Sequence, residues 1–248
     1  MATQEVEFAQ VSFTVEGGRQ LLSGISLTVE AGTTTALLGR SGSGKTTLLR
    51  TVNALVRPTS GRVLVGGQDV AEADVIALRR GIGYVIQEAG LFPHMSIERN
   101  VGMALELAGK PKTEIETRAA EMLRWVGLPE DVAKRQPWQL SGGQRQRVGL
   151  ARALASDPKV LLMDEPFGAL DPLTRAEIRG MVRDLLEVAV KTTLIVTHDL
   201  DEALYLADRV VLLEAGRIVA DLAARDVLGS TNDAMRAYVA ATWRGDAA

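Results

Sequence analysis

The sequence predicts an α/β fold: a mixed sheet with flanking helices, preceded by an antiparallel β-subdomain and interrupted by an inserted helical subdomain. Three observations indicate this fold. Runs typical of strands fill residues 6–38 and return after Lys159. Between them, from Gln87 to Pro158, the pattern is helical. A glycine-rich segment begins at Gly39, between a predicted strand and a predicted helix.

The strands are predicted from apolar alternation and from short apolar runs. Ile25, Leu27 and Val29 alternate with polar residues, and residues 36–38 form an apolar run that ends at Gly39. Further runs of the same kind predict strands at residues 63–65, 82–86, 160–163, 193–196 and 209–213.

The helices are predicted from apolar spacing and end signals. Leu48, Leu49 and Val52 follow the glycine-rich segment, and Asp171-Pro172 is typical of a helix start. Within the insertion, Thr113 and Glu116 have the spacing of a capping box. Gly127 is a plausible helix stop. The last 30 or so residues are expected to form a short strand and one or two helices.

Composition excludes several classes of protein. The 248 residues carry 28 Lys and Arg against 31 Asp and Glu, a formal charge of −3, so no broad nucleic-acid surface is expected. There is no cysteine, which excludes disulfides, thiolate metal sites and cysteine nucleophiles. We see neither a signal-peptide apolar region nor the roughly 18 to 20 apolar residues that span a bilayer. Any membrane connection is therefore expected to go through a partner.

Residues 39–46 have the sequence GRSGSGKT, a pattern typical of a phosphate-binding loop between a strand and a helix. Its glycines let successive backbone N–H groups face a phosphate, and the following helix adds its positive dipole end. Lys45 would reach the β- and γ-phosphates, and the Thr46 hydroxyl is a hard oxygen ligand suited to Mg²⁺. The residues expected to bind the nucleotide here are Gly39, Arg40, Ser41, Gly42, Ser43, Gly44, Lys45, Thr46 and Thr47.

Two carboxylates, Asp164 and Glu165, follow the apolar run 160–163. Neighbouring acids at the end of an apolar run are costly unless a cation lies beside them, so Asp164 is a candidate Mg²⁺ ligand. Glu165 is a candidate general base, because water is a poor nucleophile toward phosphorus. Alone, the pair could equally be the exit of a strand into a turn. The phosphate-binding loop in the same chain favours the catalytic interpretation.

Two more segments place polar groups at element ends. Gln87 follows the strand at 82–86, and its amide could contact Mg²⁺ or the attacking water, although by itself it could be a loop residue. Ser141, Gly142, Gly143 and Gln144 begin an arginine-rich helix whose N-terminus could receive phosphate, or could be a plain serine-capped start. A single site within one chain has little use for two phosphate-binding helix N-termini, one after residues 39–46 and one at residues 141–144. If both bind the same triphosphate, they are expected to come from two different chains.

His198 is one of only two histidines. It follows the strand at 193–196, where it could hydrogen-bond the γ-phosphate from the same sheet edge as Lys45 and Glu165. The other histidine, His94, is interpreted as a loop or interface residue and not as a ligand.

In this order the motifs resemble the nucleotide-binding subunit of an ATP-binding cassette (ABC) transporter, over residues 6–228. The most specific element is LSGGQ at 140–144. The resemblance implies a P-loop NTPase core and a head-to-tail homodimer, with each ATP between the phosphate loop of one copy and residues 141–144 of the other. It also matches Gln87 to the family's glutamine loop and His198 to its switch histidine. The stretch 168–171 matches the aspartate loop, which adds Asp171 to the nucleotide-binding residues.

The same resemblance implies one ATPase domain over residues 1–248. Its nucleotide-binding core would comprise residues 1–87 and 159–228, its helical signature subdomain 88–158, and its helical tail 229–248. The implied cofactors are ATP and Mg²⁺, with Thr46, Gln87 and Asp164 as metal ligands. The implied partners are a second copy, membrane permease subunits and, indirectly, a solute-binding protein, with no nucleic acid. The chain would then be peripheral at the cytoplasmic face of the membrane.

A narrower likeness concerns residues 84–95, YVIQEAGLFPHM, and 161–175, LLMDEPFGALDPLTR. Both resemble importers of osmoprotectants such as glycine betaine, choline or carnitine. Such proteins often carry paired regulatory modules after the cassette, for which this chain leaves no room, so gating by ionic strength is not expected. The position of the family's adenine-stacking aromatic residue falls near Val15, with Phe13 two residues earlier. Stacking on adenine would then be weaker, replaced by aliphatic contact from Val15, or supplied by Phe13. The apolar segment 91–93 could receive a helix of the membrane subunit or belong to the local core.

The expected function is therefore ATP hydrolysis that drives uptake of a solute, most similar to osmoprotectant import. Import of another solute, such as an amino acid, sulfonate or phosphonate, stays an alternative. A soluble cassette ATPase acting on DNA, ribosomes or an assembly complex is a second alternative. Such proteins tend to carry two cassettes, coiled-coil insertions or basic arms, and none is visible in the sequence.

Overall fold

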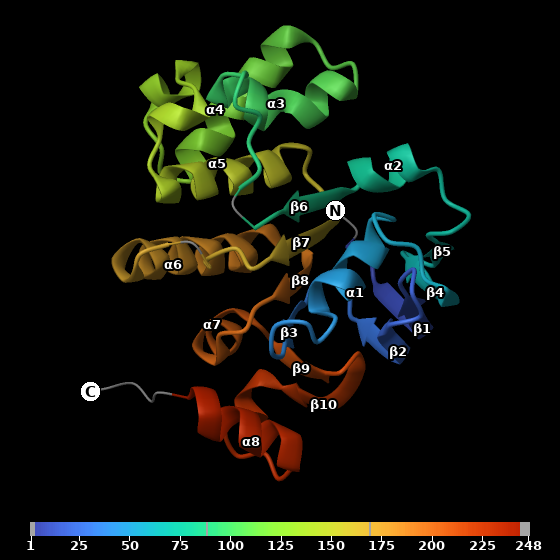
Figure 1. Cartoon of the computed structure of the whole chain (residues 1–248). Helices are drawn as coiled ribbons and strands as arrows, with labels where there is room; N and C mark the ends of the chain where they lie inside the picture. Colours follow the sequence, from blue (N-terminus) through green and yellow to red (C-terminus); the bar gives the residue numbers. More distant parts are fainter. Residues whose placement is uncertain (1–2, 88, 169, 244–248) are drawn as a thin grey trace. The chain divides into compact units, whose positions relative to one another are not determined.

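A computed structural model describes residues 3–87, 89–168 and 170–243 and divides the chain into two compact units (Figure 1). The first unit comprises Met1–Leu78 and Ala189–Ala248, and the second comprises Arg79–Val188. Two residues of the predicted motifs, Glu88 and Ala169, lie outside the described residues. So do the ends of the expected 1–248 domain, residues 1–2 and 244–248.

The first unit contains an antiparallel sheet in the strand order β2-β1-β4-β5. Alternation in the second strand is strict: Ile25, Leu27 and Val29 are buried, while Ser26 and Thr28 between them are exposed. One face of the strand is therefore packed and the other meets water, as the sequence pattern predicts. The strands are β1 (Val6–Thr14), β2 (Gln20–Val29), β4 (Ser60–Val65) and β5 (Gln68–Asp69).

The same unit contains a mixed group of strands in the order β10-β9-β3-β8. The third strand runs parallel to β8 and β9, whereas β10 forms an antiparallel pair with β9. Every residue of β3 and of β8 is buried, which explains why their sequences are continuous runs without alternation. These strands are β3 (Thr34–Leu38), β8 (Thr192–Val196), β9 (Arg209–Glu214) and β10 (Arg217–Ala223).

Helices of the first unit bury apolar residues against this mixed group. Leu200 of α7 and Met235 of α8 join one hydrophobic cluster with Leu38 of β3 and Val210 of β9. Figure 1 draws α8 in red after β10. The elements are α1 (Lys45–Val52), α7 (Leu200–Leu206), the 3₁₀ turn η3 (Ala224–Asp226) and α8 (Asp233–Thr242). A short helix, α2 (Val75–Arg80), lies at the sequence boundary between the units and was not predicted.

The second unit combines two parallel strands with helices. All five residues of β7 are buried. At Gly83 of β6, an added Cβ would lie 2.4 Å from the carbonyl oxygen of Ala153 in α5, so this helix packs directly on the strand. The strands are β6 (Ile82–Val85) and β7 (Val160–Asp164). The helices are α3 (Ile97–Leu107), α4 (Lys112–Trp125), η1 (Glu130–Lys134), η2 (Pro137–Gln139), α5 (Gly142–Ala155) and α6 (Pro172–Ala189).

These elements confirm the predicted fold class, an α/β fold with a mixed sheet, an antiparallel N-terminal sheet and an inserted helical segment. One of the predicted helix-capping signals was wrong. The capping-box spacing of Thr113 and Glu116 does not mark a helix start, because α4 begins at Lys112 after Pro111, without a side-chain cap. Gly127 does follow the end of α4, in a left-handed conformation with φ 67°. Within the described part of the chain, no helix has both the length and the apolar character needed to cross a membrane.

Candidate functional site

The phosphate-binding loop of the first unit closes around its own lysine. Lys45 is the first residue of α1, and its side chain is buried, 5% exposed. Its Nζ donates to the carbonyl oxygens of Gly39, at 2.7 Å, and Arg40, at 3.0 Å. A buried ammonium costs free energy unless oxygens surround it. The loop carbonyls supply them here and hold the positive charge at the N-terminus of a helix, which itself favours anions.

Glycines at the loop positions are required by contacts as well as by dihedral angles. Gly39, Gly42 and Gly44 all have positive φ values, 146°, 81° and 104°. A Cβ on Gly39 would lie 2.3 Å from the carbonyl oxygen of Leu213 in β9. A Cβ on Gly44 would lie 2.7 Å from the carbonyl oxygen of Leu21 in β2. The loop is thus pressed against two strands and its shape is preorganised.

Ser43 carries a buried polar group with which an anion could pair. Its hydroxyl oxygen is buried and has no hydrogen-bond partner among the described residues. Buried hydroxyls are nearly always paired, and phosphate oxygens would supply the acceptor that Ser43 lacks. Ser41 and Gly42 are exposed at the tip of the loop, and Thr46 and Thr47 are half-buried in the first turn of α1.

The oxygen donors present fit Mg²⁺. The Thr46 hydroxyl and the Asp164 carboxylate are hard oxygen ligands, one in each unit. Among residues 3–87, 89–168 and 170–243, no three His, Cys, Asp or Glu residues gather in a way that could hold a metal on their own. An ion bound by the oxygens of either unit would need phosphate oxygens and water for most of its shell, which is how Mg²⁺ usually binds.

His198 leaves the sheet at the edge where the phosphate loop begins. Val196 pairs with Leu37 in the parallel strands, and the Thr197 N–H donates to the Leu37 carbonyl at 3.2 Å. Lys45 and His198 therefore follow neighbouring strand ends of one unit. The His198 side chain is exposed. Its peptide carbonyl accepts a 2.8 Å hydrogen bond from the hydroxyl of Tyr238 in α8.

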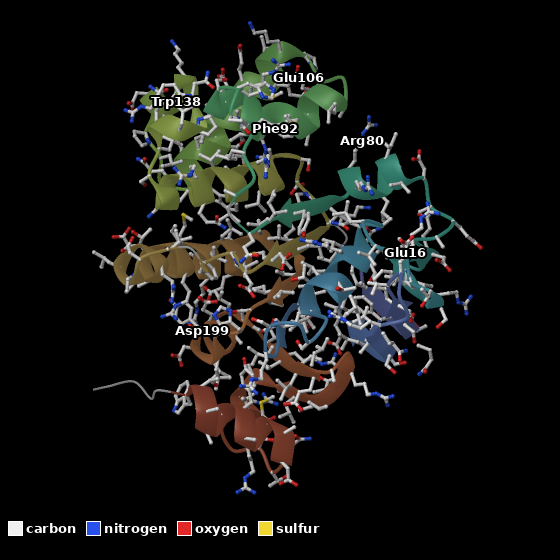
Figure 2. The ribbon with its side chains drawn as sticks, viewed as in Figure 1. Glu16, Arg80, Phe92, Glu106, Trp138 and Asp199 are labelled. Carbon is white, nitrogen blue, oxygen red and sulfur yellow. The ribbon has the colours of Figure 1, made fainter. Side chains whose placement is uncertain are left out.

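The residues around His198 are fixed by the start of α7. The buried Thr197 hydroxyl donates to Glu202 Oε2 at 2.6 Å and accepts from the Asp199 N–H at 3.0 Å. Asp199 caps α7 by accepting from the Glu202 N–H at 3.1 Å, and Figure 2 labels it. The two residues that flank His198 are thereby held in place, while its imidazole is open to solvent.

Val15 lies in the turn between β1 and β2. Its N–H donates to the Arg19 carbonyl at 3.0 Å, and its side chain is half-buried. Phe13 pairs with Leu22 across the two strands. The side chain of Leu22 would lie 2.9 Å from a Cβ on Gly44, so the sheet that carries Val15 and Phe13 contacts the phosphate loop.

The second unit carries the acidic pair at the end of β7. Asp164 is 2% exposed, and its Oδ2 accepts from the Tyr84 hydroxyl at 3.3 Å. Glu165 is half-buried and has φ 45°, in the left-handed region that a non-glycine residue seldom adopts. Such strain persists where the surroundings enforce it, often at functional sites. Neither Tyr84 nor this backbone conformation was predicted from the sequence.

Gln87 is exposed in a tight turn that the Ala89 N–H closes by donating to the Ile86 carbonyl at 3.1 Å. The turn is anchored by Arg152 of the signature helix α5. Its two terminal nitrogens donate to the carbonyl oxygens of Ala89, at 2.6 Å, and Gly90, at 2.7 Å. Burial lowers the pKa of the Arg152 guanidinium. The sequence analysis missed this residue, since nothing local marks it.

The signature segment forms the predicted helix start. Ser141 Oγ accepts from the Gln144 N–H at 3.2 Å, and Gln144 Oε1 accepts from the Ser141 N–H at 3.0 Å, which completes a capping box. Ser141 and Gly142 are exposed. Gly143 is buried, and a Cβ there would lie 2.4 Å from Thr174 Cγ2 of α6. The exposed helix N-terminus can therefore accept an anion from outside the unit.

Asp171 caps α6 by accepting from the Thr174 N–H at 3.1 Å. Hydrogen bonds from Thr174 lower the pKa of its carboxyl group, so the cap is charged at neutral pH. Charge at a helix N-terminus is favourable. Asp171 is exposed.

Comparison with known proteins decides the family. The sequence profile described as ABC transporter matches residues 22–168, more than half of the chain. The chain belongs to the ABC transporter family. The match begins in β2 and ends beside the acidic pair, so it includes the phosphate-binding loop, Gln87, the signature segment and Glu165.

Curated members of the ABC transporter family are similar over most of this chain. The glycine betaine/carnitine/choline transport ATP-binding protein of Bacillus subtilis (strain 168) is 45% identical over 86% of this chain and 56% of its own length. The methionine import ATP-binding protein of Caulobacter vibrioides is 44% identical over 94% of this chain and 72% of its own length. The chain spans a little over half the length of the osmoprotectant relatives that it matches.

Solved structures in the ABC transporter family share the fold. A dimeric ATP-binding cassette in a post-hydrolysis state, bound to ADP and Pi, is 33% identical with a TM-score of 0.81. The similarity covers 89% of this chain and 99% of that one.

Proposed function

We propose that this protein is the ATP-hydrolysing subunit of an ABC importer, which couples ATP binding and hydrolysis to solute uptake. The observation that carries the proposal is the buried Lys45 ammonium, held by the loop carbonyls beside the partnerless Ser43 hydroxyl. The Ser43 hydroxyl would pair with a phosphate oxygen, and the positive charge of Lys45 would attract the γ- and β-phosphates of ATP. The family membership supports the same assignment.

In this proposal, each unit supplies a different part of the chemistry. The first unit binds the phosphates through residues 39–47 and places His198 at the same sheet edge. The second unit supplies Glu165 as the general base that orients the attacking water, with Gln87 in the adjoining turn. Thr46, Asp164 and Gln87 would hold Mg²⁺, which supplies charge neutralisation of the phosphates when bound. Residues 1–87 and 159–228 form the proposed nucleotide-binding core, 88–158 the signature subdomain and 229–248 the tail.

The proposed assembly is a head-to-tail homodimer with ATP and Mg²⁺ at its interface. The exposed start of α5 supports this arrangement, because Ser141 and Gly142 are accessible to a second copy. Asp171 and Gln144 complete the residues proposed to face the nucleotide. Hydrolysis removes the charge that bridges the copies, and the dimer opens.

We propose membrane permease subunits as further partners, with a solute-binding protein acting through them, at the cytoplasmic face of a membrane. The contact surface would include residues 91–93. Phe92 is 40% exposed and is labelled in Figure 2. The segment is rigid because the buried Asn100 side chain accepts from the Phe92 N–H at 2.7 Å and donates to the Met95 carbonyl at 3.2 Å. An exposed aromatic residue on a fixed loop suits an apolar partner.

The proposed solute is a quaternary amine such as glycine betaine, choline or carnitine. Relatives named for glycine betaine, choline or carnitine are 42–45% identical, and one named for osmoprotectant import is 47% identical. Relatives named for methionine import and for sulfate/thiosulfate import are 44% and 47% identical. The test must therefore distinguish uptake of a quaternary amine from uptake of another solute.

Uptake in cells that lack the gene tests the proposal. Loss of labelled glycine betaine or choline uptake, with methionine and sulfate uptake unchanged, is expected. Wild-type protein should restore it and Glu165→Gln should not. If uptake of the amines is unchanged in the deletion strain, the solute assignment is wrong. If Glu165→Gln restores uptake as well as wild type, the proposed role of ATP hydrolysis is wrong.

The dimer is tested separately with a cysteine pair, since the chain has no cysteine of its own. Ser41→Cys and Ser141→Cys, combined with Glu165→Gln, should form an intermolecular disulfide in the presence of ATP and Mg²⁺. The single-cysteine variants are the controls. A pair that stays monomeric with saturating nucleotide would contradict the head-to-tail assembly.

A further inference from the structure

Tyr238 lies on α8, far from the predicted nucleotide residues in sequence, yet it contacts one of them. Its hydroxyl donates to the His198 carbonyl oxygen at 2.8 Å, across a separation of 40 residues. Tyr238 is 8% exposed. Its ring belongs to a hydrophobic cluster that also contains Leu38 and Leu200, the residues that precede Gly39 and follow Asp199.

The hydroxyl binds the carbonyl side of the peptide that joins His198 to Asp199, whose N–H donates to the Thr197 hydroxyl at 3.0 Å. Thr197 and Asp199 are held through their own hydrogen bonds to Leu37 and Glu202. The carbonyl of His198 is anchored instead by the phenol. The orientation of this peptide plane sets the direction of the bond from Cα to Cβ, and therefore where the exposed imidazole lies.

The helix that carries Tyr238 is itself tied to the sheet. At its start, Asn232 Oδ1 accepts from the Met235 N–H at 3.0 Å, and Nδ2 donates to the Val219 carbonyl of β10 at 3.0 Å. Burial raises the pKa of Tyr238 to about 12, opposed by a hydrogen bond from the Gly39 backbone. The phenol is therefore protonated and able to donate at any physiological pH, beside the first residue of the phosphate loop.

We propose that Tyr238 is a positioning residue for His198, by which α8 controls the placement of the imidazole at the γ-phosphate side of the loop. This inference rests on the proposed function for the role of His198 in hydrolysis. It adds that the hydrolysis rate depends on α8, an element outside the recognised motifs. A displacement of α8 would release the His198 carbonyl and slow turnover without removing any group that binds nucleotide.

Tyr238→Phe is a clean test because it removes one oxygen atom and keeps the ring in its cluster. A matched control is Tyr205→Phe, which removes a phenol hydroxyl from α7 of the same unit, at a residue 38% exposed. One lost hydrogen bond should lower kcat about three- to tenfold. The KM for ATP should stay within about twofold, because the groups that bind phosphate are untouched.

A double-mutant cycle separates positioning from general stability. His198→Ala removes the side chain that Tyr238 is inferred to place. In that background Tyr238→Phe should have no further effect on kcat. If the two changes lower kcat independently, so that their fold-changes multiply, the inference is overturned.

A nucleotide-free measurement keeps the inference distinct from the proposed function. Because the chain has only two histidines, the imidazole C–H resonances can be assigned with His94→Gln. Tyr238→Phe should shift the His198 resonance and leave that of His94 unchanged, whereas Tyr205→Phe should shift neither. An unchanged His198 resonance would overturn the inference. If the shift occurs but wild-type protein hydrolyses no ATP, the proposed function fails and the positioning stands.

Discussion

The Nζ atom of Lys45 lies 2.7 Å from the carbonyl oxygen of Gly39, the residue that begins the loop leading to it. The two ends of the phosphate loop are therefore joined by a charged hydrogen bond. This contact gives the buried ammonium an oxygen partner within the loop itself. It explains how a loop of exposed and glycine residues keeps a defined shape.

Lys45→Ala should weaken ATP binding. The variant loses a charge-assisted interaction, which is worth about 1.5–3 kcal/mol, so the dissociation constant should rise at least about tenfold. Isothermal titration calorimetry measures the change. Lys112→Ala is the control, because the Lys112 side chain is 87% exposed and pairs with Glu116 across one turn of α4. Equal affinities for wild type and Lys45→Ala would contradict the phosphate-loop assignment.

Gly39→Ala should lower stability more than Gly17→Ala. Both glycines have positive φ, 146° and 98°, so both substitutions add backbone strain. Only the Cβ at residue 39 also meets a backbone atom, the Leu213 carbonyl oxygen at 2.3 Å, whereas nothing lies within 4 Å of a Cβ at residue 17. The extra overpacking should cost about 1–3 kcal/mol and lower Tm by several degrees beyond the control in thermal unfolding. Equal Tm values would show that the loop is not pressed against β9.

Arg152→Lys should lower kcat several-fold with little change in the KM for ATP. A lysine keeps the charge but lacks the fork that reaches the Ala89 and Gly90 carbonyls together, so the turn that carries Gln87 should loosen. Steady-state kinetics separate kcat from KM. Arg183→Lys is the control, since Arg183 forms an exposed pair with Glu187 one turn along α6. A change in KM alone would mean that the turn serves binding and not hydrolysis.

Stability at high pH should report the Tyr238 environment. Burial raises the pKa of Tyr238 from 10.0 to about 12, so the folded state holds the phenol proton more tightly than the unfolded state does. The stabilisation that this provides is fully present below pH 10 and is lost as pH rises toward about 12. Chemical unfolding across this range should therefore show a smaller loss of stability in Tyr238→Phe than in wild type. Parallel losses in both proteins would contradict the raised pKa.

Much of the fold and part of the site follow from local sequence. The strand alternation at Ile25–Val29, the phosphate loop and the capping box at Ser141 are each fixed within a few residues, so sequence patterns predict them. The spacing of Thr113 and Glu116 alone was not enough to predict a capping box correctly. Thr113 lies inside α4, one residue beyond its start. Pro111 precedes that helix as its N-cap residue, without a side-chain hydrogen bond.

Contacts between distant segments could not be predicted. Tyr238 and Arg152 donate to backbone carbonyls 40 and 63 residues away, and no local pattern in the sequence links such distant pairs. The left-handed Glu165 is likewise imposed by its surroundings, because the residue type itself disfavours φ 45°. These three features are set by tertiary packing rather than by local propensity.

The central claim, that this chain hydrolyses ATP with Glu165 as the base, is tested most directly by phosphate release from purified wild type and Glu165→Gln. The amide is close in size to the carboxylate but cannot accept the proton of the attacking water. We expect steady release by wild type, loss of about two orders of magnitude or more in the variant, and unchanged ATP affinity in both. Equal rates of release from the two proteins would contradict the account.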